Sequence, residues 1–388
     1  MSEAPLTIGV VAGEASGDLL GAHLIRALQE HLPDAQFTGI GGPRMQAAGL
    51  NALYPMEKLA VRGYVEVLRH YLEILGIRRS VAKHFLAEPP ALFVGVDAPD
   101  FNLGLELKLR SAGIATAHFV SPSIWAWRGE RIHQIKRAVS HMLTVFPFEE
   151  AIFQRAGIPV TYVGHPLAEM LWPVPPRSAA REQLRLPASA RIIAMLPGSR
   201  ESELEHMADL FLETAAQIAA VLPDAHFLVP LVNRPTRELF ETARFRHASA
   251  ELNLTVLFGH AHEAMVAADV VLAASGTATL EAALLGRPVV IAYRMPSLSW
   301  RLMKNRGYLP YVGLPNILAG EFVVPEFLQD DATAENLSQA LLNVLFDPTV
   351  RSRLEDRFSR IADELRQDSA GRIAAALVPL LRNGAAAC

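Results

Sequence analysis

Cysteine is nearly missing from this chain: Cys388, at the very end, is the one cysteine among 388 residues. One thiol cannot build a disulfide framework or a cysteine-based metal site. The apolar runs are too short for a membrane span, and the first residues lack the basic segment of a signal peptide. We therefore expect a protein of the reducing cytoplasm.

Charge of one sign is not in excess either. The formal net charge is -4 at pH 7, and lysine and arginine are dispersed along the chain. Such a balance gives no general attraction for nucleic acid, so we expect no nucleic-acid partner. The sequence also lacks an Asp-x-Asp metal motif, a Walker A loop, a G-x-S-x-G elbow and a Cys/His ligand cluster. We expect neither a metal nor a cofactor.

What the chain does have is a repeated alternation of Val/Ile-rich segments with longer amphipathic ones, typical of parallel sheets with crossover helices. At 51% hydrophobic residues it can fill two cores. We predict an α/β protein in which two Rossmann-like domains face a cleft. Strands are expected at residues 6–12, 36–40, 91–96, 115–120, 141–146 and 160–164, then at 191–196, 226–232, 254–258, 270–274 and 288–293.

The prolines of residues 171–178 suit a stiff connector and not a helix or a central strand. We therefore predict domains at 1–172 and 173–345. Residues 346–388 are expected to be helical, with breaks near Asp347-Pro348 and Gly371. Their apolar stripes must be buried on the first domain or on a partner subunit, so a homo-oligomer is possible.

Residues 272–282 are the most informative stretch. A predicted strand ends at Ala274, a helix follows, and between them stand Ser275, Gly276, Thr277, Ala278 and Thr279. Free N–H groups and the helix dipole at such a position favour a bound phosphate. Glu281 falls one turn later, within reach of a ribose hydroxyl. The alternative is an ordinary Ser/Thr helix cap.

A second phosphate-binding turn is predicted after the strand that ends at Leu196. Gly198 and Ser199 would expose backbone N–H groups, and Arg200 offers a planar fork for diphosphate oxygens. The alternative is a surface arginine paired with Glu203 or Glu205.

Asp97 follows a predicted central strand, at the edge where α/β sheets place their ligands. It is the candidate general base, although a capping or structural role is the alternative. Asp100 and Asn102 are better suited to capping the helix that starts near Phe101.

The turn after the first strand, residues 11–18, is glycine-rich but lacks G-x-G-x-x-G spacing. Glu14 would repel a pyrophosphate, so the turn is interpreted as a lip for a neutral sugar. Glu14 and Ser16 would face the ligand beside Gly17, and Asp18 would cap the following helix. Capping by all three polar side chains is the alternative.

Residues 61–75 are more apolar than a core-facing helix needs, and cations flank them at Lys58, Arg78, Arg79 and Lys83. Docking on an anionic lipid surface, or binding of acyl chains, is one interpretation, with contacts from Val65, Leu68 and Leu72. Burial against the sheet is the other. The pair His260 and His262 is interpreted as polar surface and not as a metal site. For His165, a hinge residue and a ligand contact are the two interpretations.

Seven blocks in the right order resemble the lipid-A-disaccharide synthase family over almost the whole chain. They are residues 11–18, 95–102, 120–128, 196–200, 229–233, 274–281 and 314–320. The resemblance implies a metal-independent, inverting glycosyltransferase of the glycosyltransferase-B fold. It implies Asp97 as the base and Arg200 on the diphosphate, with Glu14 as a catalytic or a substrate-positioning residue and further polar site residues at Arg294 and Asn316.

The implied reaction transfers 2,3-diacylglucosamine from UDP to the 6-hydroxyl of 2,3-diacylglucosamine 1-phosphate, with closure about residues 173–176. Asn102, Ser121, Trp127 and Arg128 would then lie beside the acceptor or its acyl chains. Both substrates are lipids, which favours peripheral contact with the inner face of the cytoplasmic membrane. Two rivals are a UDP-amino-sugar epimerase and a non-catalytic lipid- or nucleotide-binding regulator.

Overall fold

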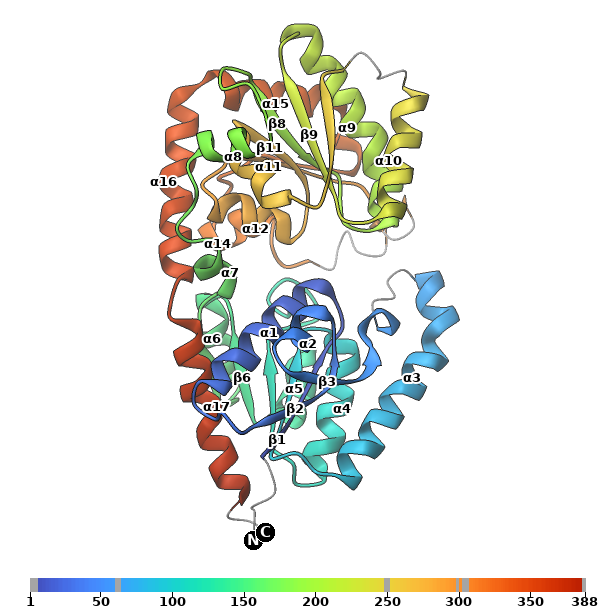
Figure 1. The fold of residues 1–388 in the computed structure, drawn as a ribbon, viewed down its shortest axis with the longest axis vertical. Coiled ribbons are helices and arrows are strands. Elements are labelled where there is room, and N and C mark those ends of the chain that lie inside the picture. The colour runs from blue at the N-terminus through green and yellow to red at the C-terminus, as the bar shows by residue number, and fades with distance from the viewer. Residues whose placement is uncertain (1–5, 60–63, 248–251, 298–299, 302–306, 386–388) are drawn as a thin grey trace. The chain divides into compact units, whose positions relative to one another are not determined.

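The computed structural model describes residues 6–59, 64–247, 252–297, 300–301 and 307–385. The chain forms two compact units, coloured by position along the sequence in Figure 1. Unit 1 is Met1–Glu169 with Leu365–Cys388, and unit 2 is Met170–Glu364. Each unit has its own parallel sheet, which confirms the predicted α/β class with two Rossmann-like domains.

The described sheet of unit 1 has strand order β3-β2-β1-β4-β5-β6-β7, all parallel. The helices α1, α2 and α17 pack together, and α3, α4 and α5 form a second group. The strands are β1 (Thr7–Ala12), β2 (Gln36–Gly41), β3 (Leu50–Pro55), β4 (Leu92–Val96), β5 (Thr116–Phe119), β6 (His141–Thr144) and β7 (Val160–Tyr162). The helices are α1 (Ala15–Gln29), α2 (Pro43–Ala47), η1 (Met56–Lys58), α3 (Tyr64–Ala87), α4 (Pro99–Ser111), η2 (Gly129–Arg131), α5 (Ile132–Ala138), α6 (Pro147–Arg155), α7 (Pro166–Met170) and α17 (Ser369–Ala385).

Unit 2 has strand order β10-β9-β8-β11-β12-β13, again parallel. Its strands are β8 (Ile192–Leu196), β9 (His226–Leu231), β10 (Leu254–Phe258), β11 (Val270–Ala274), β12 (Val289–Tyr293) and β13 (Glu326–Leu328). Its helices are α8 (Arg177–Gln183), α9 (Glu201–Val221), α10 (Arg234–Arg246), α11 (Ala261–Ala267), α12 (Thr277–Leu284), α14 (Leu314–Ala319), η4 (Gln329–Asp331), α15 (Ala334–Phe346) and α16 (Pro348–Leu365).

All eleven predicted strands are present, shifted at their ends by no more than two residues. The prediction missed β3 and β13, each at one edge of its sheet. The central strands β4, β8 and β11 are buried along their whole length, whereas β3 and β13 are mostly partly or fully exposed. An edge strand needs no continuous apolar run, so its sequence signal is weak.

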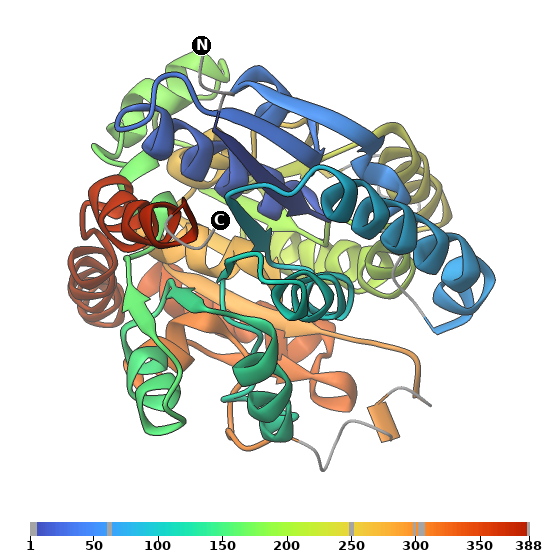
Figure 2. The same ribbon diagram turned by 90° about the horizontal axis from the view of Figure 1, so that it is seen from below.

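The domain limits differ from those predicted. Unit 1 ends at Glu169 instead of residue 172, and the chain returns to it at Leu365, so α16, predicted to lie in the tail, falls in unit 2. The last helical break lies at residues 366–368, and Gly371 lies inside α17. Asp368 has φ 53°, a left-handed conformation that no regular helix contains. The α17 helix lies beside α1 in Figures 1 and 2 and buries Ile373, Leu377 and Leu381.

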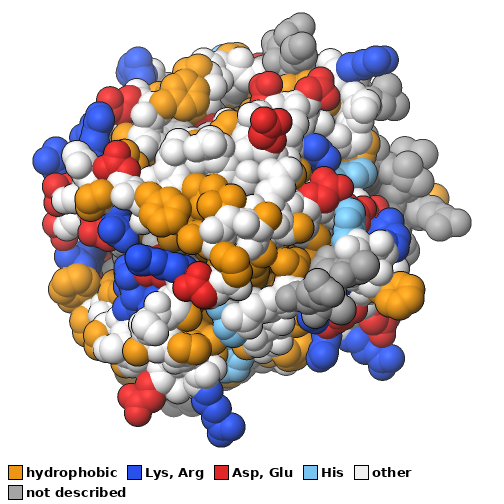
Figure 3. All heavy atoms as spheres, turned by 90° about the horizontal axis from the view of Figure 1, so that it is seen from above, with side chains coloured by type: hydrophobic (Ala, Val, Ile, Leu, Met, Phe, Trp, Pro, Cys, Tyr) orange, Lys and Arg blue, Asp and Glu red, His pale blue; other side chains and the backbone are white. Residues whose placement is uncertain are grey.

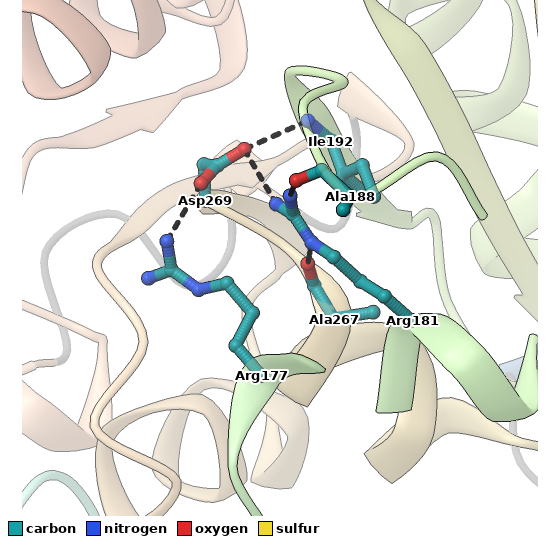
Figure 4. Close-up of polar contacts among 6 residues, drawn as sticks. All are labelled: Arg177, Arg181, Ala188, Ile192, Ala267 and Asp269. Atoms are coloured by element: carbon teal, nitrogen blue, oxygen red, sulfur yellow. Dashed lines mark hydrogen bonds and ion pairs between the residues drawn. The ribbon is translucent and has the colours of Figure 1, made fainter. Parts of the chain in front are cut away.

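The amino-terminal edge of the unit 2 sheet is held by a buried ionic cluster around Asp269, shown in Figure 4. Its carboxylate accepts from Arg177 Nη1 (2.8 Å), Arg181 Nη2 (3.0 Å) and the Ile192 N–H (2.9 Å). Arg181 also donates to the carbonyls of Ala188 and Ala267. The cluster joins α8 to the starts of β8 and β11, at the end of the sheet away from the ligand edge, so its role is structural.

On the face drawn in Figure 3, side chains of both charges are interspersed with apolar ones. Among the described residues, no helix combines the length and the apolar character that crossing a membrane requires.

Candidate functional site

Both sheets reverse their strand order at one point, between β1 and β4 in unit 1 and between β8 and β11 in unit 2. Parallel α/β sheets bind ligands outside the carboxyl ends of the strands at such a switch point. Four of the predicted site residues follow those four strands: Glu14 after β1, Asp97 after β4, Arg200 after β8 and Ser275 after β11. The structure thus places these four residues at the carboxyl edge of the sheet of their own unit.

The turn after β1 holds Glu14 at the start of α1. Its backbone carbonyl accepts the first helical bond, from the Asp18 N–H, but its side chain does not cap the helix. Ser16 is partly exposed in the first turn, and Gly17 is buried against Ala12. A Cβ on Gly17 would lie 3.4 Å from the Ala12 Cβ, so the helix packs closely on its strand.

The predicted role of Asp18 in capping its own helix is wrong. Its carboxylate is buried and accepts from the N–H groups of Arg44 and Met45, each at 3.0 Å. Those groups open α2, a different helix. Spacing along the sequence could not reveal this, because the partner lies 26 residues away.

Asp97 stands where the sequence placed it, directly after β4, and its backbone is unusual. Asp97 and the next residue, Ala98, both have positive φ, at 51° and 45°. Such residues cost of order 1–3 kcal/mol each and gather at functional sites. The Asp97 N–H donates to the Phe119 carbonyl (2.9 Å), which ties the turn to β5. The Asp97 side chain is partly exposed.

Asn102 holds this turn through side-chain hydrogen bonds and, contrary to the prediction, does not cap α4. Its side chain is fully buried, and its Nδ2 donates to the carbonyls of Asp97 (2.8 Å), Val11 (3.1 Å) and Val96 (3.4 Å). It therefore joins the ends of β1 and β4. Asp100, at the exposed start of α4, forms an ion pair with Arg131.

A charged pair that sequence reasoning missed lies in the core of unit 1. Glu106 of α4 and His118 of β5 are both fully buried, and His118 Nδ1 lies 2.6 Å from Glu106 Oε1. Burial disfavours the charged imidazole, but the adjacent Glu106 carboxylate, its hydrogen bond and the charge of Asp97 outweigh burial and raise the pKa of His118. Burial also raises the pKa of Glu106, against the pull of His118.

The loop after β5 carries Ser121, Trp127 and Arg128. The Ser121 side chain is buried, and its Oγ donates to the Pro122 carbonyl (2.9 Å). The Arg128 guanidinium lies 4.1 Å from the centre of the Trp127 ring, a cation–π contact, and both residues are partly exposed. Arg128 has φ 53°, so the loop turns sharply there.

Two further ionisable groups, Glu149 and His165, are buried at this edge of unit 1. Glu149 accepts from Trp125 Nε1 (2.9 Å) and the Phe146 N–H (3.1 Å). Burial raises the pKa of Glu149 to about 7, although these donors oppose the shift. His165 lies 5.8 Å from the Phe146 ring, and burial lowers its pKa to about 4. The position of His165 directly after β7 could have indicated that it lies at this edge. Glu149 gave no such signal, because it lies within an amphipathic helix.

In unit 2, the turn after β8 brings Gly198, Ser199 and Arg200 together around Glu203. The Glu203 carboxylate accepts from the Ser199 N–H (2.9 Å), the Arg200 N–H (3.3 Å) and Arg200 Nη1 (3.1 Å). Gly198 has φ 135°, and a Cβ there would lie 2.5 Å from the Glu203 Cβ. The N–H of Ser199 is thus occupied and not exposed as predicted, and Arg200 makes the pair that the alternative foresaw.

The start of α12 carries the second set of residues predicted to bind phosphate. Gly276 and Thr277 are exposed, and the Gly276 carbonyl accepts from Thr279 Oγ1 (2.8 Å). The first helical N–H groups, at Thr277 and Ala278, have no acceptor within the helix itself. The Ser275 N–H instead continues the sheet by donating to the Ala292 carbonyl (3.1 Å).

Glu281 lies one turn into α12 and is paired with His262 of α11, with 2.9 Å between Glu281 Oε2 and His262 Nε2. His262, interpreted above as polar surface, therefore contacts a predicted site residue. It joins the starts of two helices at the ligand edge of unit 2.

Arg294 and Asn316 differ in what they can still offer a ligand. Arg294 follows β12, is partly exposed and donates to the Ala332 carbonyl (2.5 Å). Asn316 is fully buried: its Oδ1 accepts from the N–H groups of Val323 and Val324, and its Nδ2 donates to Glu326 (2.7 Å) and to the Val324 carbonyl. In this structure Asn316 organises the loop before β13.

Of the predicted lipid-contacting residues, Leu72 is 80% exposed on α3. Residues 61–63 lie outside the described residues, as do the side chains of Val65 and Leu68. Further along the same helix, Ile77, Val81 and Phe85 are buried in the core with Ile74 packed against them. Lys58 pairs with Glu73 at 2.7 Å.

In the part of the chain that the structure describes, no three His, Cys, Asp or Glu side chains are grouped as a metal site would require.

Comparison with known proteins identifies the family. The family model of lipid-A-disaccharide synthetase matches residues 8–377. A lipid-A-disaccharide synthase from Aromatoleum aromaticum is 58% identical over 374 residues, 96% of each chain, and one from Methylobacillus flagellatus is 54% identical over 97% of this chain and 100% of its own.

Among solved structures, a UDP-GlcNAc 2-epimerase from Neisseria meningitidis bound to UDP-GlcNAc covers 97% of this chain and 99% of its own, with a TM-score of 0.64. At 14% identity that likeness shows the fold alone, which is the glycosyltransferase-B type. The near-complete match at more than half identity decides the family: the chain belongs to the lipid-A-disaccharide synthetases.

Proposed function

We propose that the chain works as a lipid-A-disaccharide synthase by one inverting displacement. As a member of this family it is a glycosyltransferase, and the reaction joins two acylated glucosamines. The donor is UDP-2,3-diacylglucosamine and the acceptor is 2,3-diacylglucosamine 1-phosphate, whose 6-hydroxyl becomes part of a β-1,6 link as UDP leaves. The observation that carries this mechanism is the placement of Asp97 and Arg200 at the switch points of separate sheets.

The acceptor hydroxyl must lose a proton as it attacks, and Asp97 is the proposed base. Its carboxylate is partly exposed, while its backbone is fixed by Phe119 and Asn102. A base held in this way loses little entropy when the substrate arrives. Glu14, after the neighbouring β1, is proposed to contact the sugar, with Ser16 and Gly17 forming the same lip. Acceptor contacts are proposed for Ser121, Trp127 and Arg128.

The leaving UDP gains negative charge, and the groups proposed to stabilise it are in unit 2. Arg200 can turn its guanidinium from Glu203 to the diphosphate, since that side chain is 39% exposed. The N–H groups at the start of α12 add a second anion site after β11. Glu281, held by His262, is proposed to bind the ribose, and Arg294 lies after the next strand.

Because these groups can carry the leaving-group charge, we propose that turnover needs no divalent metal. Activity that survives EDTA supports this, and activity restored only by magnesium or manganese contradicts it.

Membrane contact is proposed for the exposed side of α3. Leu72 is 80% exposed, and the cations Arg79 and Lys83 are exposed on the same helix. An apolar side chain beside cations suits the surface of an anionic bilayer. The substrates carry acyl chains, so the enzyme must meet them there, on the cytoplasmic side.

One experiment tests the reaction as a whole. Purified protein is incubated with UDP-diacylglucosamine and the acceptor monosaccharide 1-phosphate, and the products are identified by mass spectrometry. Disaccharide 1-phosphate and UDP in equal amounts support the proposal. An isomerised UDP-sugar without disaccharide would instead indicate an epimerase, and no turnover with intact substrate binding would indicate a regulator.

A further inference from the structure

The loop after β5, residues 120–128, ends on a cation to which the proposed function gives no specific task. The Arg128 guanidinium lies 4.1 Å from the centre of the Trp127 ring, and both residues are partly exposed. Among the described residues Arg128 forms no ion pair, whereas Arg131, three residues later, is paired with Asp100. Contact with the face of an aromatic ring leaves the N–H donors at the edge of a guanidinium available to an anion. Arg128 is therefore a candidate anion-binding residue after β5.

Both ends of this loop have a strained backbone. Val120 has φ 76° and Arg128 has φ 53°. A left-handed conformation is an outlier for a β-branched residue, and strain of this kind gathers at functional sites, where the surrounding structure must hold it. The Val120 N–H donates to the Leu143 carbonyl of β6 (3.0 Å). The Trp127 N–H donates to the Ser123 carbonyl (3.1 Å). These contacts define the path of the loop up to Arg128.

A buried carboxylate from the next helix holds the loop from a second side. Glu149, in the first turn of α6, is buried, and its Oε1 accepts from Trp125 Nε1 (2.9 Å). Its Oε2 accepts from the Phe146 N–H (3.1 Å), and a further hydrogen bond links its carboxylate to the Ser121 side chain. A buried carboxylate is costly unless donors surround it, so these bonds are not easily given up. Glu149 therefore ties two points of the loop to α6.

The ring of Trp125 is held as well as its N–H group. It meets the rings of Phe146 and Phe148 edge-on, at centroid distances of 6.5 and 5.3 Å, and these two phenylalanines stack on each other at 5.8 Å. Aromatic pairs of this kind contribute beyond the area that they bury. Trp125 cannot turn away from α6 without losing both its hydrogen bond and its ring contacts. It lies three residues before Arg128, so it restrains the end of the loop.

The start of α6 does not compete with Arg128 for an anion. Helix starts that follow parallel strands bind anions because their first N–H groups are free. Here the Phe146 N–H donates to Glu149, and Pro147 has no N–H. The Glu149 N–H itself donates to the Phe146 carbonyl (3.2 Å). The side chain of Arg128 is therefore better suited than this helix start to bind an anion.

We propose that Arg128 binds the 1-phosphate of the acceptor, and that Glu149 and Trp125 are positioning residues that hold the loop, and with it Arg128, in place. The proposal rests on the proposed function, in which the acceptor carries a phosphomonoester and the donor a diphosphate. The diphosphate is assigned to unit 2, so the acceptor phosphate needs a cation of its own. A guanidinium can donate two parallel N–H bonds to a phosphate, which orients the sugar as well as binding it.

The first test compares two acceptors in the complete chain, 2,3-diacylglucosamine 1-phosphate and the same sugar without the phosphate. The donor is UDP-2,3-diacylglucosamine, and the ratio of the two kcat/KM values is the phosphate preference. The wild type should prefer the phosphorylated acceptor. Arg128→Ala should lower this preference by roughly 10- to 100-fold, because a charge-assisted contact is lost. An unchanged preference in Arg128→Ala, or a wild type with none, overturns the phosphate site.

If the phosphate-free acceptor is not turned over, two soluble probes replace the pair of acceptors. Glucosamine 1-phosphate and glucosamine are then measured as competitive inhibitors against the acceptor, and the ratio of their inhibition constants gives the phosphate preference. The same loss is expected in Arg128→Ala, and equal inhibition of the wild type by both probes overturns the phosphate site.

The second test breaks the hydrogen bond to Glu149 and keeps an aromatic ring in place. Trp125→Phe removes the indole N–H and should lower the phosphate preference by about three- to tenfold. Glu149→Leu should lower it as well, whereas Glu149→Gln keeps an oxygen for the indole N–H and should retain most of it. The matched control is Thr116→Val at the start of β5, which loses a buried hydrogen bond to the Ala138 carbonyl (2.8 Å). This control should lower thermal stability and leave the phosphate preference unchanged.

The variants distinguish the failure of each part. A reduced preference in Arg128→Ala, with wild-type preference in Trp125→Phe and Glu149→Leu, overturns the positioning role alone. Should Glu149→Leu not fold, Trp125→Phe decides, because it keeps the ring contacts. Disaccharide formation with the same preference in every variant overturns this inference and leaves the proposed function standing. A wild-type chain that forms no disaccharide contradicts the proposed function itself.

Discussion

The ligand edges of the two units differ in how firmly their predicted site residues are held. In unit 1, Asp97 sits on a strained turn above buried side chains, and its backbone is bonded to Phe119 and Asn102. In unit 2, Arg200 and the start of α12 are partly exposed, and the arginine rests on Glu203. A proton acceptor must be held in a fixed position, whereas a diphosphate can be bound by groups that rearrange when it arrives. Unit 1 fits the first demand and unit 2 the second.

The strongest way to break this comparison is to neutralise the proposed base. Asp97→Asn should lower kcat by roughly 10²–10⁴, the usual size of a general-base contribution, with little change in UDP affinity. Steady-state kinetics and UDP calorimetry measure the two quantities. Asp100→Asn, three residues away and exposed, is the control and should be nearly silent. Wild-type turnover in a folded Asp97→Asn protein would contradict the assignment.

The second test concerns two buried ionisable groups at the edge of unit 1, Glu149 and His165, and their effect on stability as the pH changes. The raised pKa of Glu149, about 7, means that the folded state holds a proton that the unfolded state releases. Its stability contribution is therefore present below about pH 4.5 and lost as pH rises through 7. The lowered pKa of His165, about 4, acts oppositely: stability is lost below pH 4 and is recovered above 6.5.

Over pH 4.5–6.5 the two slopes should nearly cancel in the wild type. Each of the two pKa changes corresponds to about 3 kcal/mol. In Glu149→Gln the free energy of unfolding should rise with pH, and in His165→Gln it should fall with pH. Denaturant unfolding at several pH values measures both. Glu150→Gln, its partly exposed neighbour on α6, is the control. A flat profile in both variants would show that these groups titrate as if exposed.

In unit 2 the corresponding change is Arg200→Ala. It should weaken UDP binding by about 1.5–3 kcal/mol, because a charge-assisted contact to the diphosphate is lost. Calorimetric titration with UDP measures this. Arg234→Ala removes an arginine that is 87% exposed and paired with Glu238, so its affinity should match the wild type. Unchanged UDP affinity in Arg200→Ala would mean that the start of α12 binds the phosphates without Arg200.

The sequence predicted the features that have a local signal and missed those that depend on residues far apart in the chain. Asp97 and Ser275 were placed correctly because each follows a buried apolar strand, a signal that lies within a few residues. The partners that fix the sites are distant in sequence: Asp18 reaches α2, and His118 pairs with Glu106 across two elements. Such contacts depend on tertiary packing, which no local pattern contains. The edge strands β3 and β13 were missed because half-exposed strands need no apolar run.

The smallest expected effect concerns the surface of α3. Leu72→Ser should weaken association with anionic phospholipid vesicles by about 1.5 kcal/mol, the lower end for withdrawing one leucine from an apolar phase. Vesicle flotation measures this, and thermal unfolding should be unchanged, because Leu72 is 80% exposed. Val221→Ser, equally apolar and 60% exposed at the end of α9, should leave flotation unaltered. Ile77→Ser, buried on the same helix, should unfold the protein instead, since it opens the core. If Leu72→Ser floats as well as the wild type, and the triple Val65, Leu68 and Leu72 to serine variant does too, α3 does not contact the membrane.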